Sequence, residues 1–122
     1  MPQEYYLDLL KARAAPLERP FSDGIEVGGG VTQPFMVERI WAGPAGNYVE
    51  QWSIRSGKRN VVYSHPAKLI FVQGMQSATT LVDEVNAPVP LAPGFYQLVF
   101  VVEGRFMGST DIEVAEAGSA AA

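Results

Sequence analysis

The clearest alternation of hydrophobic and polar positions lies within residues 91–114 and predicts a β-hairpin. In its first half, large apolar or aromatic side chains recur at every second residue, at Tyr96, Leu98, Phe100 and Val102. A period of two residues places these side chains on one face of a strand, which we expect to pack against the core.

The register of this hairpin follows from the side chains that it would bury. A two-residue loop would place Ser109 opposite Leu98 and bring a polar group onto the buried face. Shifting the pairing by one residue instead places Ile112 opposite Tyr96. We therefore expect the second register, with residues 103–105 as a three-residue loop.

Residues 4–15 have a different pattern, which predicts a short helix. The segment is rich in Leu, Lys, Arg and Ala, and Tyr6, Leu9 and Leu10 recur at the three- and four-residue spacing of one helix face. Pro16 would end this helix. Because so short a helix is marginal alone in water, we expect it to dock on the rest of the chain or on a partner.

Between these two elements, short apolar runs are separated by turns rich in Gly, Pro and Asn. The runs that we read as strands are residues 25–27, 35–41, 48–55, 61–63, 69–73 and 79–85. Turn signals about every 8–12 residues are typical of an all-β sandwich. We place a helix and flexible Pro/Gly-rich arm at 1–33, the β-sandwich domain at 34–115 and a disordered tail of small residues at 116–122.

Two features resemble a known class of domain. Residues 91–104 resemble the closing hairpin of bacterial immunoglobulin-like accessory modules, and Trp52 lies on a central strand, as a tryptophan often does in such modules. The resemblance covers about a quarter of the chain, and the paired cysteines of antibody domains are missing. It implies an immunoglobulin-like antiparallel β-sandwich, here with a short N-terminal helical arm.

Composition narrows the possible partners. The 122 residues are enough for one domain with a hydrophobic core. The net charge of −4 argues against binding to nucleic acid or to anionic membranes. There is no cysteine, which excludes disulfides but leaves the compartment open. The N-terminus lacks the pattern of a signal peptide, so we expect a cytoplasmic protein. The triple glycine at 28–30 lacks the Gly-Lys-Ser/Thr of a phosphate loop and indicates a flexible bend.

Candidates for catalysis are few. His65 is the only histidine, in a turn-like Ser-His-Pro triplet, and we expect it to be a solvated loop residue. Asp83 and Glu84 are adjacent in a strand, so they point to opposite faces and cannot act as a close pair. The sequence therefore predicts no catalytic residue, no cofactor and no metal site.

Surplus apolar side chains give the most informative functional signal. Val99 and Val101 lie on the face opposite the core residues of their strand, so that strand should be covered on both sides. The candidate interface comprises Tyr6, Leu9, Leu10, Val99 and Val101. It predicts a non-enzymatic protein-binding or assembly module, with a homodimer as the favoured form.

Two alternatives remain open at the level of sequence. One is a small ligand-binding or hydrolytic domain with a pocket near His65 and Tyr63. The other is a structural subunit of a larger particle, such as a phage or shell component. A convergent cluster of titratable groups would favour the first alternative.

Overall fold

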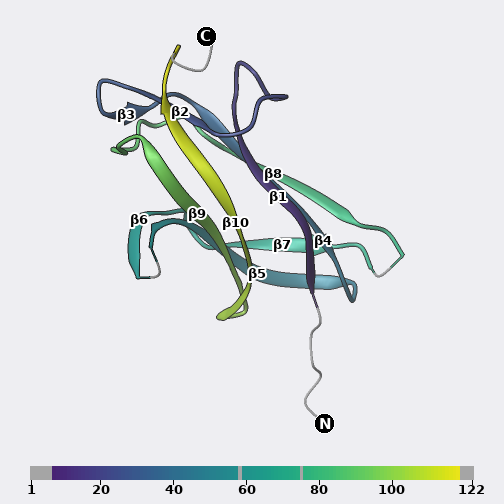
Figure 1. Cartoon of the computed structure of the whole chain (residues 1–122). Coiled ribbons are helices and arrows are strands. Elements are labelled where there is room, and N and C mark those ends of the chain that lie inside the picture. Colours follow the sequence, from purple (N-terminus) through teal and green to yellow (C-terminus); the bar gives the residue numbers. More distant parts are fainter. Residues whose placement is uncertain (1–6, 58, 75, 119–122) are drawn as a thin grey trace.

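The computed structural model of the chain describes residues 7–57, 59–74 and 76–118, and these form an all-β fold. Two sheets curl around a common core (Figure 1). The strands of the described residues are β1 (Asp8–Pro16), β2 (Ile25–Gly28), β3 (Val31–Thr32), β4 (Phe35–Ala42), β5 (Gly46–Ser56), β6 (Asn60–Ser64), β7 (Lys68–Val72), β8 (Thr79–Val85), β9 (Gly94–Val102) and β10 (Arg105–Glu116).

The smaller sheet has the order β1-β4-β8, and the larger has the order β3-β2-β10-β9-β5-β6. The long strand β5 pairs with β7 along its first half and with β6 along its second half. All of these pairs are antiparallel except β10 with β2, which is parallel. The all-β prediction is confirmed, whereas an antiparallel arrangement throughout is wrong at β2.

The predicted N-terminal helix is wrong for the residues that the structure describes. Residues 8–16 form β1, which pairs with β4 and brings Ala14 opposite the buried Val37. Helix propensity is a weak preference, and the backbone partners and buried contacts offered by β4 outweigh it. The first residues of the predicted helix, 4–6, lie outside the described residues. Separately, no helix in the described part of the chain is long and apolar enough to cross a membrane.

The arm after β1 contributes further strands. Ile25 and Val27 of β2 are buried, in agreement with the strand predicted there, and β2 pairs with β3. Gly29 and Gly30 connect these two strands with φ angles of 64° and 82°, a conformation that suits glycine. The glycines therefore form a hairpin turn. At the other end, the predicted tail begins at Glu116, the last residue of β10, and residues 119–122 lie outside the described residues.

The β9–β10 hairpin combines the two registers considered above. Ile112 lies opposite Tyr96, which confirms the predicted pairing along most of its length. The three-residue loop is wrong, however, because Arg105 already pairs with Val102 and leaves a two-residue turn.

A β-bulge reconciles this tight turn with the predicted pairing. Glu103 and Gly104 have φ angles of 51° and 77°, the left-handed conformation typical of two-residue hairpin turns. The register then shifts by one residue between Phe106 and Gly108. At Gly108, a Cβ atom would lie only 2.8 Å from the side chain of Leu9, so glycine lets β1 approach β10 closely.

The core lies between the two sheets. It includes an edge-to-face pair of Trp41 and Phe100, one from each sheet, with ring centroids 6.2 Å apart. Side chains of β5, β9 and β10 meet in this core: Trp52, Ile54, Leu98, Phe100 and Ile112.

Candidate functional site

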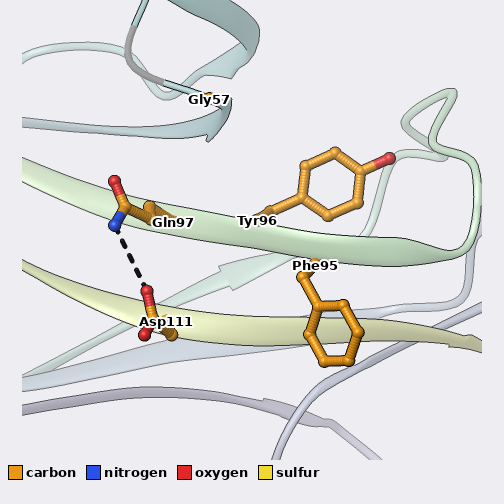
Figure 2. Close-up of a pocket in the computed structure, with 5 residues that line it drawn as sticks. All are labelled: Gly57, Phe95, Tyr96, Gln97 and Asp111. Atoms are coloured by element: carbon orange, nitrogen blue, oxygen red, sulfur yellow. Dashed lines mark hydrogen bonds between the residues drawn. The ribbon is translucent and has the colours of Figure 1, made fainter.

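Surface hollows give a first view of where a ligand could bind. Four hollows of about 170 to 410 Å³ are lined by described residues, and the largest is lined by Gly57, Phe95, Tyr96, Gln97 and Asp111 (Figure 2). Neither His65 nor Tyr63 lines any of the four. The pocket that the hydrolytic alternative requires near His65 is therefore not among them.

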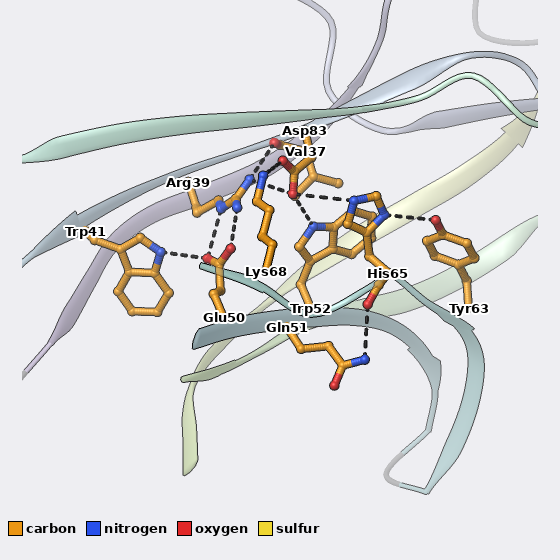
Figure 3. A network of polar contacts seen from close by, with 10 residues as sticks. All are labelled: Val37, Arg39, Trp41, Glu50, Gln51, Trp52, Tyr63, His65, Lys68 and Asp83. Carbon is orange, nitrogen blue, oxygen red and sulfur yellow. Dashed lines mark hydrogen bonds and ion pairs between the residues drawn. The ribbon is translucent and has the colours of Figure 1, made fainter. Parts of the chain in front are cut away.

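The most concentrated chemistry lies inside the protein, in a network of charged side chains between the sheets (Figure 3). Arg39 of β4 is completely buried and forms a bidentate ion pair with Glu50 of β5. Its Nε donates to Oε2 at 2.9 Å, and its Nη2 donates to Oε1. Its Nη1 lies 3.1 Å from Oδ2 of Asp83 on β8. One guanidinium thus joins the two sheets, with a carboxylate from each.

Both core indoles donate to the same carboxylates. Trp41 Nε1 donates to Glu50 Oε2 at 2.8 Å, and Trp52 Nε1 donates to Asp83 Oδ2 at 2.8 Å. Among the described residues, no buried side-chain nitrogen or oxygen lacks a hydrogen-bond partner. A network in which each buried polar atom has a partner fixes the packing of the core.

Asp83 lies at the outer end of this network. Lys68 of β7, which is half-exposed, forms an ion pair with Asp83 Oδ1 of β8. Burial alone would raise the pKa of Asp83, but the hydrogen bonds from Lys68 and Trp52 and the charge of Arg39 together hold it below the usual value of 3.8. Asp83 is therefore a carboxylate at neutral pH.

His65 caps the same region. Its imidazole stacks on Trp52, with ring centroids 4.5 Å apart, and its Nδ1 is 2.9 Å from the hydroxyl of Tyr63. Its Nε2 is 3.7 Å from Asp83 Oδ2. Burial lowers the pKa of His65 below 6.5 despite the opposing charge of Asp83, so the ring is neutral at neutral pH. The predicted loop position is confirmed, because His65 lies between β6 and β7, but the prediction of a solvated side chain is wrong, because only 19% of it is exposed.

Three neighbouring side chains have the order of a nucleophile, a base and an orienting acid: Tyr63, His65 and Asp83. The gap between His65 and Asp83 exceeds hydrogen-bond length, and Asp83 is already paired with cations. Burial, followed by the charge of Asp83, raises the pKa of Tyr63 and keeps it a phenol. Nor do the described residues contain a group of three or more His, Asp or Glu side chains that could hold a metal ion.

Sequence reasoning missed Arg39 and Glu50. Glu38 and Arg39 break the alternation of β4, and a bulge would explain that break, but β4 pairs with β8 without any register shift. Arg39 instead occupies an inward position, as Glu50 does between Tyr48 and Trp52. Opposite charges at inward positions of two strands were the available signal for a buried ion pair.

A second candidate is the outer face of the larger sheet. Five apolar side chains there, on four strands, form what we call the outer patch: Val49, Leu69, Phe71, Val101 and Phe106. Leu69 pairs with Val49, and Val101 pairs with Phe106. Val101 is half-buried, and the other four are between 46% and 65% exposed.

The structure separates the residues of the predicted interface. Leu9 is half-buried and packs against the core, whereas Leu10 is exposed at a bulge of β1 in the smaller sheet. Val99 is buried within the chain, and Val101 belongs to the outer patch. Tyr6 lies outside the described residues. The described part of the arm therefore does not form one surface with the two valines.

The fold is similar to parts of larger proteins. Alkylpurine DNA glycosylase AlkC from Pseudomonas fluorescens, bound to DNA containing an abasic site analogue, has a TM-score of 0.61 at 12% identity, covering 89% of this chain and 30% of that chain. A β-glucosidase from Listeria innocua in complex with gluconolactone has a TM-score of 0.56 at 14% identity, covering 92% of this chain and 16% of that chain.

These similarities concern the fold alone, because identity is low and the chain spans less than a third of the length of either protein. No protein-family model and no curated protein sequence matches the chain.

Proposed function

We propose that the chain is a non-enzymatic binding module with an immunoglobulin-like sandwich, and that it self-associates through the outer patch. The observation that carries this proposal is the exposure of neighbouring large apolar side chains on four strands of one sheet face. Contiguous apolar surface of this kind is uncommon on monomers and marks protein contacts.

The arrangement of the patch suits a symmetric dimer. Leu69 and Val49 lie opposite each other on β7 and β5, and Val101 and Phe106 do so on β9 and β10. Gln51 pairs with Val101 on the same face, which makes Val49 and Val101 diagonal neighbours. A single self-complementary patch is sufficient for a two-fold dimer, in which the same residues of both copies meet.

The N-terminal arm supports this proposal by its position. Had the arm covered the outer face of the larger sheet, the patch would be an ordinary internal contact. Its described part is instead divided between β1 of the smaller sheet, where Leu9 packs against the core, and β2 and β3 of the larger sheet. Among the described residues, no strand of the arm pairs with β5, β7 or β9, which supports the use of the outer patch by a second molecule. A cytoplasmic location remains a prediction from the sequence.

Light scattering after size exclusion, over a wide range of protein concentrations, tests the proposal. We expect the wild-type chain to be a dimer, and Leu69→Lys or Phe106→Lys to be monomeric. Val82→Lys is the matched control, because Val82 is similarly exposed but lies on the smaller sheet. Leu10→Lys shows separately whether the exposed leucine of β1 contributes.

A wild-type chain that stays monomeric at every concentration would contradict self-association. A hydrolytic activity that His65→Ala abolishes would contradict the non-enzymatic proposal and favour the alternative of a hydrolytic domain. Circular dichroism of each variant establishes that a change in mass does not reflect unfolding.

A further inference from the structure

The hollow beside Phe95 lies where β5 has ended but β9 continues. Pairing of β9 with β5 reaches Gln97, which lies opposite Arg55, whereas pairing with β10 continues to Gly94. Residues 94–96 therefore have a strand on one side only, and Gly57 in the turn after β5 forms the far wall of the hollow. The hollow measures about 410 Å³, within the range of small-molecule sites.

The exposed ring of Phe95 and the hydrogen-bonded pair of Gln97 and Asp111 line this hollow. The side chain of Phe95 is 80% exposed, and its ring points away from the side of β9 that carries Tyr96 (Figure 2). Gln97 Nε2 donates to Asp111 Oδ1 at 3.2 Å. Phe95 and Gln97 are two residues apart on one strand face, a separation of about 6.8 Å.

The hydrogen bond between Gln97 and Asp111 leaves both a donor and acceptors for a ligand. The Gln97 amide keeps one N–H donor and its carbonyl oxygen, and Asp111 keeps its second carboxylate oxygen. A ligand that both donates and accepts hydrogen bonds, as a hydroxyl does, matches this set. A phosphate or a carboxylate, which only accepts, does not match it.

The surrounding charges also disfavour anions. Arg55 lies beside Gln97, but its Nε donates to Ser53, farther along β5 and away from Phe95. Asp111 balances this charge on the other side, and Glu113 lies opposite Phe95 as a further exposed carboxylate. The site thus offers an apolar ring face and hydroxyl-matching groups, with Arg55 and Arg59 on the side of β5 and Asp111 and Glu113 on the side of β10, so the charges of both signs oppose each other.

We propose that this hollow binds a pyranose ring of a neutral saccharide. The C–H face of the sugar lies against Phe95, and its hydroxyls exchange hydrogen bonds with Gln97 and Asp111. The site is independent of the outer patch, because Phe95 and Val101 are six residues apart along β9, about 20 Å.

A heteronuclear NMR titration of the full chain tests this with glucose, galactose, N-acetylglucosamine and maltose. We expect at least one of these sugars to shift the backbone amides of Gly57, Phe95 and Gln97 in a saturable manner. Phe95→Ala should weaken that binding about tenfold, whereas Phe95→Trp should preserve it. Phe21→Ala is the matched control, because it removes an exposed phenylalanine that lies outside both the hollow and the outer patch.

Two results would overturn the proposal: no saturable shift with any of the four sugars, or sugar binding by Phe95→Ala as tight as that of the wild type. A third would be shifts at the hollow with arginine amide, a cationic probe for the carboxylates, but not with sugars. Gln97→Ala is a second variant should Phe95→Ala fail to fold, and it should weaken sugar binding without changing the oligomeric state. A monomeric wild-type chain would leave this proposal intact, so its failure and that of self-association are distinguishable.

Discussion

The imidazole of His65 lies flat on the indole of Trp52, with their planes inclined by only 9°. The same indole donates its N–H to Asp83 on the opposite sheet. Trp52 thus connects His65 to the buried charge network between the sheets. The titration of His65 is therefore linked to the stability of the contact between the two sheets.

Stability should fall as the pH falls below neutral, and His65 should cause the first part of that loss. The pKa of His65 is lower in the folded chain than its unfolded value of 6.5, so the unfolded chain binds the proton more readily. Folding stability is therefore greatest above 6.5 and declines toward the lower folded pKa. Urea unfolding at several pH values should show this decline in the wild type but not in His65→Phe, which keeps an aromatic ring over Trp52.

At more acidic pH, Asp83 should add a second loss of the same sign. Its folded pKa is also lowered, so the stability it contributes is present above 3.8 and disappears as the pH falls through the folded pKa. A wild-type chain whose stability rises as the pH falls from neutral to 6.5 would contradict the assignment of His65, and one whose stability does not fall below pH 3.8 would contradict that of Asp83.

Removal of one partner of the buried Arg39–Glu50 ion pair should lower the free energy of unfolding more than replacement of both partners by apolar side chains. Glu50→Gln leaves the guanidinium of Arg39 with one carboxylate fewer in a dry interior, and we expect a loss of about 3–5 kcal/mol of unfolding free energy. The double variant Arg39→Met with Glu50→Leu removes both charges and should lose less than Glu50→Gln alone. A double variant that is the less stable of the two would contradict this expectation.

Truncation of the central aromatic contact should destabilise the core strongly. Phe100 is completely buried against Trp41, so Phe100→Ala should cost about 3–5 kcal/mol in denaturant unfolding. Phe95→Ala is the control, because the exposed ring of Phe95 should change stability by no more than about 0.5 kcal/mol. A loss below roughly 1 kcal/mol for Phe100→Ala would contradict the packing described here.

The N-terminal segment should be indispensable for folding. A chain that starts at Gly24 lacks β1, exposes the edge of β4 and removes the buried Leu7, Ala14 and Ala15 from the core. We expect it to be unfolded or aggregated by circular dichroism and size exclusion. Recovery of a soluble, folded chain without these residues would contradict the role of β1 in the smaller sheet.

The sequence by itself determined the all-β class, the β9–β10 pairing and the aromatic core, because strict alternation admits one arrangement of faces. Tyr96, Leu98 and Phe100 can be buried together only if β10 presents Ile112 opposite Tyr96. The two-residue turn at Glu103 and Gly104 was beyond this reasoning, because a bulge can absorb a one-residue difference without changing the faces.

The tertiary structure alone decided what β1 and the inward charges do. Residues 8–16 have helix-favouring side chains, and only the open edge of β4 makes a strand the better choice. Arg39, Glu50 and Asp83 come from three strands of two sheets, so their contact depends on how the sheets stack, which no local pattern contains. Long-range packing sets both outcomes, because a buried charge and an unpaired edge are stabilised only by partners distant in the chain.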